Sequence, residues 1–450
     1  MTLRRVRLRA PRLRLAKGVF FALVLSACAT EDHTPPNVLL VTLDTTRVDH
    51  LSTYGYARAT SPQLDRLAAE GTAHTRAVSP SSWTLPAHAS LFTGKLPRSH
   101  GARYDPEGPL LLAAAIDAPE GIRARGLAPG ERTLAARLRD AGYATGAVVA
   151  GPWLLEAFGL AAGFEHWDDA GIVDYAGRPA HEVVAAARRW LGTVLRSEPR
   201  RPFFLFVNLY DPHFPYDPPS AHARRFLPPG VQLDRQQRAQ WPALYDAEIF
   251  AMDEQLGILL DYLRESGVWD ETLVVVTSDH GELFGEHGEW GHGRFLHQPL
   301  LAIPLVVKPA RGGGRASRDD ERVSLHQVFG WILDATIGHD GEDPEPSETV
   351  LAEVHPMTAT DSTGHWVALW DGPLKYLRAS SGVERLHDLE RDPSEEVDLA
   401  RKRPKDLARL RTRLDRELAA LPAPLPAGAE VEIDRETREA LERLGYLDTP

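Results

Sequence analysis

The stretch Asn-Val-Leu-Leu-Val-Thr-Leu-Asp-Thr-Thr-Arg at positions 37 to 47 decides the fold class of this 450-residue chain. Its residues 38–43 form an apolar run, typical of a central parallel strand that helices cover on both faces. Asp44 follows at the carboxyl end of the strand, where open α/β sheets bind their ligands. The stretch therefore predicts a buried strand with a polar residue at the edge where function is expected.

Strands and helices alternate along the rest of the chain. A helix is expected from Pro62 to Gly71, and Pro86 is expected to open another, because proline favours the first turn of a helix. Further helices are expected at 131–141 and 243–265, and further strands at 143–149, 202–209 and 272–277. This alternation predicts an α/β fold with a doubly wound, mostly parallel sheet flanked by helices.

A segment rich in Asp, Glu, Pro and Gly at 338–348 marks the expected domain boundary. Three short antiparallel strands are predicted beyond it, followed by a charged helix; they span 366–370, 374–378, 384–389 and 404–420. We therefore expect a large α/β domain over 37–345 and a smaller C-terminal α+β subdomain over 346–450.

The N-terminal 27 residues carry seven Lys or Arg and no acidic residue, and they end in a short apolar run. That run is too short to span a bilayer and is typical of a signal peptide. Leu25-Ser26-Ala27-Cys28 resembles a bacterial lipobox, with 28–36 as a linker. These features predict an exported protein, anchored in the cell envelope through lipid on Cys28, at the periplasmic face of the outer membrane. The alternative is a leader cysteine without a role.

The charge balance excludes one class of partner. Loss of the seven leader charges would lower the formal net charge from −12 to −19, and a strongly acidic surface argues against nucleic acid. An anionic substrate would then need a local positive field. A bound divalent cation, Arg47 and Lys308 could supply that field.

A lone hydroxyl precedes a proline-started helix in Ser-Ser-Trp-Thr-Leu-Pro-Ala-His-Ala-Ser-Leu-Phe-Thr-Gly at 81 to 94. Thr84 there would face free backbone NH groups and the positive end of the helix dipole, which favour an alkoxide and an anion. This position indicates a nucleophile. The alternative is that Thr84 only caps the helix.

Asp279 and His280 follow the expected strand at 272–277, in Thr-Ser-Asp-His-Gly-Glu. Together with Asp44 they combine hard carboxylate oxygen with imidazole nitrogen, a ligand set suited to a divalent metal ion. Each could instead be a turn residue after a strand. Three such segments in this order favour the metal site.

These segments resemble the sulfatases of the alkaline phosphatase superfamily, and the resemblance runs from about Pro36 to the C-terminus. It implies that 37–345 is a catalytic domain, that Asp44, Asp279, His280 and Thr84 hold a divalent metal ion (Ca, Mn, Zn or Mg), and that Thr84 is the nucleophile. Sulfatases carry Cys or Ser at the start of a C/S-x-P-x-R motif and oxidise it to formylglycine. This chain has Thr84, Pro86 and His88 at the matching positions, and threonine cannot become that aldehyde.

Further roles are implied by the same resemblance. His213 would bind substrate or donate a proton, His88 would hold the nucleophile, Lys308 would contact the ester oxyanion, and His292 would bind substrate; Arg47 is expected to bind substrate through its charge. A structural histidine or a surface lysine is the alternative in each case. His287 and His297 are expected to be structural.

The departures from the sulfatase pattern favour phosphorus over sulfur. Sulfatases usually carry Gly-Lys-Trp-His where this chain has Ala150 to Leu154, so two positive contacts to the substrate are missing. We therefore expect a metal-dependent hydrolase of anionic esters, with phosphate diesters or phosphonate monoesters favoured. The ester would be a sulfated or phosphorylated glycan, lipid or small molecule. The alternatives are a sulfatase proper and a non-catalytic lipoprotein that binds anionic glycans.

Overall fold

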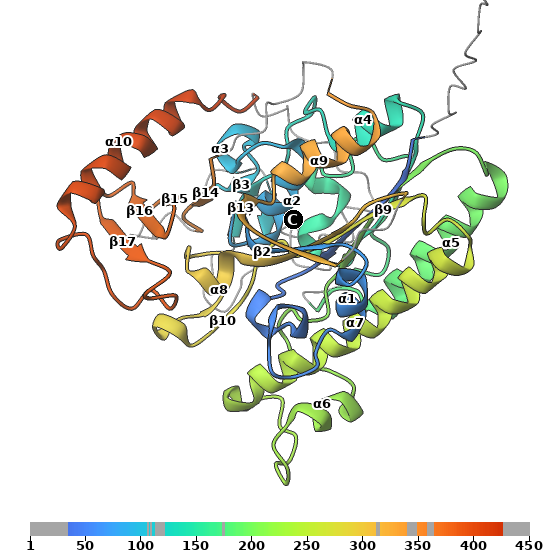
Figure 1. Ribbon diagram of the computed structural model, residues 1–450, viewed down its shortest axis with the longest axis horizontal. Coiled ribbons are helices and arrows are strands. Elements are labelled where there is room, and N and C mark those ends of the chain that lie inside the picture. The colour runs from blue at the N-terminus through green and yellow to red at the C-terminus, as the bar shows by residue number, and fades with distance from the viewer. Residues whose placement is uncertain are drawn as a thin grey trace, which may run out of the picture. The chain divides into compact units, whose positions relative to one another are not determined.

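A mixed eight-stranded sheet lies at the centre of the computed structural model (Figure 1). The structure describes residues 35–105, 108, 110–112, 122–172, 176–311, 316–339, 349–357 and 364–425. In spatial order the strands are β13 (Ser317–Ser324), β2 (Thr72–Val78), β12 (Ala302–Lys308), β9 (Thr272–Thr277), β1 (Asn37–Leu43), β8 (Phe203–Leu209), β6 (Ala144–Val148) and β7 (His166–Asp168).

Strand β1 lies inside the sheet between β9 and β8, and both of these strands run parallel to it. Thr42 pairs with Asn208 of β8 on one side and with Thr277 of β9 on the other. The carboxyl ends of these three strands therefore meet at one edge of the sheet.

Helices cover both faces of the sheet, which explains why β1 is apolar throughout. Val38 and Leu40 pack into the cluster that contains residues of α2 (Thr84–Thr93), α4 (Leu134–Asp140) and α9 (Gln327–Thr336). Leu39 and Val41 pack into the opposite cluster, with α1 (Pro62–Ala68), α5 (Ala180–Ser197) and α7 (Trp241–Glu265). Figure 1 shows these two helical layers on either side of the sheet. The predicted fold class is confirmed.

A four-stranded antiparallel sheet follows toward the C-terminus, with strands β14 (Leu351–Val354), β15 (Trp366–Asp371), β16 (Leu374–Ala379) and β17 (Glu384–Asp388) in that order. Helix α10 (Pro404–Ala420) packs Leu410 and Leu414 against it, in the same cluster as Tyr376 and Leu386. The expected boundary at 345 lies outside the described residues, so the domain limits stay predictions.

The remaining elements are short. They are β3 (Arg103–Tyr104), β4 (Leu110–Leu112), β5 (Ile122–Arg125), β10 (Leu283–Phe284), β11 (Trp290–Gly291), α3 (Pro97–His100), α6 (Ser220–Phe226) and α8 (Gln298–Leu301). Short 3-10 helices occur at Val48–His50, Ser52–Tyr54, Pro152–Leu154, Glu156–Phe158, Arg238–Gln240 and Glu286–Gly288.

The N-terminal 34 residues, with Cys28, also lie outside the described residues, so the lipid anchor is untested. Among the helices of the described ranges, none combines the length and the apolar character that crossing a bilayer requires.

Strand β12 overturns the role predicted for Lys308. This strand runs antiparallel to β9, and Lys308 pairs with Val274 near the amino-terminal end of β9. Its buried ammonium donates to the backbone oxygens of Trp269 (2.7 Å) and Thr272 (3.1 Å). Lys308 therefore lies at the edge of the sheet opposite Asp44, and the predicted contact with an ester oxyanion is wrong.

The variant Lys308→Met should lower the free energy of unfolding while leaving catalytic efficiency unchanged. Two buried carbonyl groups lose their donor, which costs about 1 to 3 kcal/mol. Urea denaturation measures the first effect, and initial rates of the folded variant measure the second. A large loss of kcat/KM without a loss of stability would restore the role in substrate binding.

Candidate active site

Three ligand-type side chains converge at the edge where β1 and β9 end. One ligand atom from each of Asp44, Asp279 and His280 lies within 4.8 Å of the other two. All three residues are fully buried. The sequence analysis predicted that these three residues, which come from separate parts of the chain, form one site. The structure brings them together.

A strained turn fixes Asp44 at the end of β1. Thr45 has a φ of +52°, which a β-branched residue adopts only when its surroundings hold it there. The Tyr245 hydroxyl donates to the Thr45 carbonyl (2.6 Å) and accepts from the Arg47 amide (2.8 Å). Helix α7 thereby holds the turn, and the Thr45 amide donates to Asp279 Oδ1 at 3.2 Å.

His280 presents a lone pair to the two carboxylates. Its Nδ1 lies 2.9 Å from the Gly281 carbonyl and donates to it, so the neutral ring carries no proton on Nε2. Nε2 lies 3.4 Å from Asp279 Oδ2. Gly281 is required here because a Cβ would lie 2.0 Å from the Pro299 oxygen.

Two carboxylate oxygens at this point are buried without hydrogen bonds. Asp44 Oδ1 and Asp279 Oδ2 make none within the part of the chain that the structure describes. An unpaired buried anion is costly unless a cation or a proton balances it. Two carboxylate oxygens without hydrogen bonds and an unprotonated imidazole nitrogen, all within 4.8 Å of one another, therefore fit a divalent metal ion.

The electrostatics agree with this fit. Burial and the neighbouring Asp279 raise the pKa of Asp44 well above its usual value. Burial acts to raise the pKa of Asp279, but the neighbouring His280 and His88 and the backbone amides of His280 and Thr45 together lower it. Burial lowers the pKa of His280 to about 4, so its ring is neutral near pH 7 and free to act as a ligand.

The Thr84 hydroxyl lies beside this cluster, with Oγ1 at 3.3 Å from His280 Nε2. Helix α2 begins at Thr84 itself, two residues before the proline expected to open it. The capping position belongs to Trp83, so Thr84 is not the helix cap of the alternative interpretation. It stands in the first turn, where the helix dipole favours negative charge.

A chain of hydrogen bonds fixes the backbone of Thr84. Asn208 Nδ2 donates to the Thr42 hydroxyl (3.1 Å), which lies 3.0 Å from His88 Nε2. His88 Nδ1 donates in turn to the Thr84 carbonyl at 2.9 Å. Burial lowers the pKa of His88, so it acts as a neutral positioning residue and contacts Thr84 through the backbone.

Asn208 is a site residue that sequence reasoning missed. Its Nδ2 also donates to Asp44 Oδ2 at 3.1 Å, and its Oδ1 accepts from the amides of Ala150 and Gly151. The available signal was an amide inside an otherwise apolar strand, Phe203–Leu209. Such a residue is buried only with partners.

Glu282 is a second residue that was missed, and it organises the outer part of the site. It is buried and lies 3.2 Å from His292 Nδ1, and it accepts from the Tyr216 hydroxyl at 3.2 Å. Although burial alone would lower the pKa of His292, Glu282 raises it. The signal was the acid two residues after His280, within the segment already quoted.

His292 and His213 stand next to the cluster in a row of rings. The centroid of His292 is 4.5 Å from that of His280, and His213 lies 5.1 Å beyond it. Burial and the neighbouring His292 lower the pKa of His213 to about 3. His292 therefore lies beside His280, which contacts Thr84, and His213 lies one ring farther away.

Arg47 does not offer a free charge to a substrate. Its guanidinium forms ion pairs with Asp49 (2.7 Å) and Glu286 (2.6 Å) and donates to the Glu282 carbonyl (3.0 Å). Through these contacts, Arg47 links the end of β1 to the loop that contains Glu282. The structure thus corrects the expectation that Arg47 supplies a positive field for an anion.

Two other groups of ligand-type side chains occur in the described ranges, and neither has a free carboxylate. His287 and His297, expected to be structural, stack at 3.9 Å beside Glu395, which pairs with Lys375. Glu353, near His355 and His365, pairs with Arg98 at 3.0 Å. Only the group with Asp44 combines two unpaired carboxylate oxygens within these ranges.

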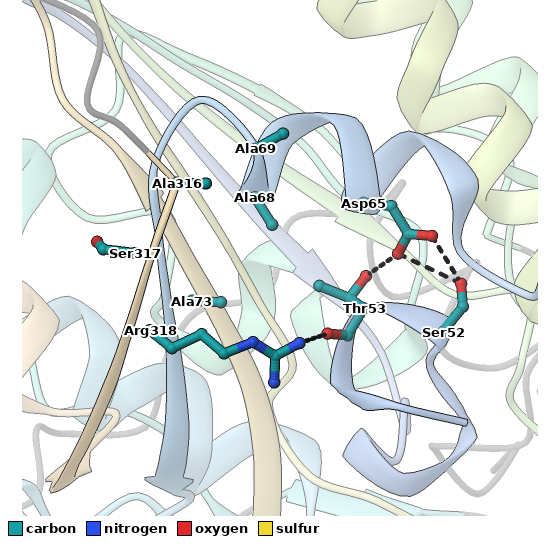
Figure 2. Close-up of a pocket in the computed structure, with 9 residues that line it drawn as sticks. All are labelled: Ser52, Thr53, Asp65, Ala68, Ala69, Ala73, Ala316, Ser317 and Arg318. Atoms are coloured by element: carbon teal, nitrogen blue, oxygen red, sulfur yellow. Dashed lines mark hydrogen bonds between the residues drawn. The ribbon is translucent and has the colours of Figure 1, made fainter. Parts of the chain in front are cut away.

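A cavity of about 440 Å³ lies between α1 and the starts of β2 and β13 (Figure 2). Its polar groups are already engaged within the chain. Asp65 accepts from the hydroxyls of Ser52 and Thr53, and Arg318 donates to the Thr53 carbonyl. Its lining residues include none of those assembled around Thr84, so the cavity does not mark the site.

Comparison with known proteins places the chain in a family context. The model of the family described as Sulfatase matches residues 36–339. A choline-sulfatase from Rhizobium meliloti (strain 1021) is 25% identical over 277 residues, covering 51% of this chain and 54% of that protein. The multifunctional alkaline phosphatase superfamily protein PehA of Trinickia caryophylli is 28% identical over 372 residues, 65% of this chain and 71% of that protein.

The fold itself matches a solved structure. The phosphonate monoester hydrolase of Agrobacterium radiobacter aligns with a TM-score of 0.65 at 20% identity, over 86% of this chain and 95% of that chain. At this identity the likeness supports the architecture alone.

Removal of one carboxylate should release the divalent ion that the cluster is built to hold. We expect Asp44→Asn and Asp279→Asn to lose bound metal in elemental analysis, and a chelator to lower the melting temperature of the wild type but not of these variants. Metal present at 100 times its Kd would stabilise the fold by about 2.7 kcal/mol. Asp65→Asn, in the separate cavity, should behave as wild type. Equal metal content in Asp279→Asn and wild type would contradict the site.

Proposed function

Because this chain belongs to the sulfatase family, whose model it matches over residues 36–339, we propose that it is a metal-dependent hydrolase of anionic esters with Thr84 as nucleophile. Family neighbours include both a choline-sulfatase and a phosphonate monoester hydrolase. Between the two chemistries, we favour phosphate diesters or phosphonate monoesters as substrates.

One observation carries the proposal: the Thr84 hydroxyl lies 3.3 Å from His280 Nε2, beside the two unpaired carboxylate oxygens. A divalent ion held there lowers the pKa of an oxygen bound to it and neutralises charge on an anionic substrate. Residues of the chain itself position Thr84 and favour the developing negative charge. His88 fixes the backbone of Thr84, and the first turn of α2 favours negative charge at the attacked atom.

The reaction would proceed in two displacements. Thr84 Oγ gives its proton to a water molecule and forms a bond to phosphorus, while the bond from phosphorus to the alcohol oxygen breaks and the alcohol oxygen takes up a proton. Water then attacks phosphorus, which releases the phosphate or phosphonate product and restores the hydroxyl. His292, which lies beside His280 and whose pKa Glu282 raises, would give the departing alcohol its proton.

The identity of the nucleophile supports phosphorus. A formylglycine hydrate releases sulfate through its second hydroxyl, whereas a threonine ester has no second hydroxyl and must wait for water. The segment where sulfatases carry Lys and His forms a short helix at Pro152–Leu154, with Trp153 packed on Trp83 at 4.6 Å. No cationic side chain of this segment is therefore available to a sulfate group.

The second candidate is a sulfatase proper, favoured by the similarity to the choline-sulfatase. Thr84 would then attack sulfur directly or orient an attacking water. The same substrate panel separates the two candidates.

The test compares aryl sulfate, phosphate monoester, phosphodiester and phosphonate monoester substrates on the wild type and on Thr84 variants. Phosphodiester or phosphonate turnover should exceed sulfate turnover, and Thr84→Ala should lose at least about 10³-fold in kcat because no nucleophile remains. Thr84→Ser should keep part of the activity, and mass spectrometry should find the phosphoryl group on Thr84 of the wild type.

Thr93→Ala is the matched control, since Thr93 is buried on the same helix but its hydroxyl bonds only to backbone groups, the Ala89 carbonyl and the Lys95 amide. Wild-type rates in Thr84→Ala would end the nucleophile assignment. Sulfate esters turned over far faster than every phosphorus ester would select the sulfatase.

We also propose that lipid on Cys28 anchors the protein to the periplasmic face of the bacterial outer membrane. The proposal rests on the basic, apolar leader that ends in Leu-Ser-Ala-Cys. Labelled fatty acid should be incorporated into the wild type expressed in a bacterial host and not into Cys28→Ser, with the label recovered in the outer-membrane fraction. An unlabelled wild type would end this proposal.

A further inference from the structure

The short helix α8 contacts the backbone beside His280. The Leu300 carbonyl of α8 accepts from the Gly281 amide at 2.8 Å, and the Gly281 carbonyl in turn accepts from His280 Nδ1. The contact is close, because a Cβ at Gly281 would lie 2.0 Å from the Pro299 oxygen. The position of α8 therefore helps to set where the His280 ring lies.

The same helix contacts the loop that leads to Thr84. The Leu301 carbonyl accepts at 2.8 Å from the amide of Ser79, which precedes Thr84 by five residues. This loop is also bonded to the C-terminal sheet, since Ser81 Oγ donates to the Glu353 carbonyl of β14 at 3.1 Å. One turn of helix thus links the loop of a predicted metal ligand to the loop of the predicted nucleophile.

An ion pair of the C-terminal subdomain holds the start of α8. Lys375 of β16 and Glu395, which follows β17, are both buried, and their charged groups lie 2.6 Å apart. Lys375 Nζ also donates to the Leu296 carbonyl (2.5 Å), and Glu395 Oε2 accepts from the Gln298 amide (2.7 Å). Each member of the pair is therefore bonded to the backbone at the start of α8 as well as to its partner.

Stability alone is a weak reason for such a pair. Two buried charges lose their hydration, and apolar residues of similar volume often replace a buried ion pair without loss of stability. Glu395 also has a φ of +59°, which is unfavourable for a residue with a side chain. Leu300 and Leu301 already pack in one apolar cluster with the C-terminal sheet. Apolar contacts are not directional, however, whereas a charged pair with two backbone hydrogen bonds fits one register of α8.

We propose that Lys375 and Glu395 are positioning residues of the active site: they hold α8 in the register at which its carbonyls place His280 and the loop before Thr84. The C-terminal subdomain then takes part in assembling the site. The effect on catalysis rests on the proposed function, whereas the effect on α8 is measurable without turnover.

The test uses the double variant Lys375→Met with Glu395→Leu. Both charges are removed together, because either one alone would be left buried without a partner. Leucine, like glutamate, is unbranched at Cβ, so the backbone conformation at Glu395 is no more strained than before. We expect amide hydrogen exchange at Ser79 and Gly281 to be at least about tenfold faster than in the wild type, because their acceptors are no longer held in place.

The metal site and turnover provide two further readouts. Titration with Mn²⁺ and with Zn²⁺ should show dissociation constants raised by about 10- to 100-fold, as when the hydrogen-bond partner of a metal-binding histidine is disturbed. For the ester turned over fastest, kcat should fall by about tenfold or more and KM should change less, because Thr84 and His280 are displaced relative to one another. A role in stability alone would change neither quantity in the folded variant.

Lys308→Met is the matched control, because Lys308 is also a buried lysine that donates to backbone oxygens but lies at the opposite edge of the sheet. Leu414→Ala is a second control, since it opens a cavity in the core of the C-terminal subdomain, outside the cluster that contains α8. Both should leave the exchange of Ser79 and Gly281 as in the wild type. Equal acceleration in Leu414→Ala would overturn the assignment to the ion pair.

Unchanged exchange at both amides in the folded double variant would overturn the proposal, and so would faster exchange with unchanged metal affinity and kcat. Glu395→Gln, which is isosteric, replaces the double variant if that variant does not fold, and it should show the same changes to a smaller degree. Faster exchange in a protein that turns over no ester supports the positioning of α8 and removes the proposed function alone. Turnover that the double substitution leaves intact removes the positioning role and leaves the function standing.

Discussion

The burial of two carboxylates at one point is the constraint on which the rest of this structure depends. Asp44 and Asp279 are fully buried, and each leaves one oxygen without a hydrogen bond within the described residues. Such a pair is stable only when a cation or a proton balances its charge. The neutral His280, the strained turn at Thr45 and the hydroxyl of Tyr245 all serve to hold those oxygens in place.

The same constraint connects the core of the sheet to Thr84. Asn208 binds Asp44 directly and, through Thr42, also orients His88, which holds the Thr84 carbonyl. The ligands and the nucleophile therefore share one hydrogen-bond network across β8, β1 and α2. Because a network of this kind is positioned by rigid strands, the site would need little rearrangement to bind a divalent cation.

The sequence predicted the parts of the site that lie at the ends of apolar runs. An apolar run marks a buried strand locally, so the residue that follows it can be assigned to the end of that strand. Asp44, Asp279 and His280 follow that rule. Asn208 and Glu282 did not stand out, because their partners come from other strands and loops. Lys308 was misplaced for a related reason: a single apolar run does not reveal that β12 runs antiparallel. The charge of Arg47 was predicted to be free for an anion because its partner Glu286 lies 239 positions away in the sequence.

The charge of the cluster also bears on how a substrate binds. Two carboxylates and a neutral imidazole together balance one divalent cation, so the loaded cluster would carry little net charge. With Arg47 neutralised by Asp49 and Glu286, the head group depends on oriented donors rather than on a strong field. The first turn of α2 and His292, whose pKa Glu282 raises, are the groups placed to provide them.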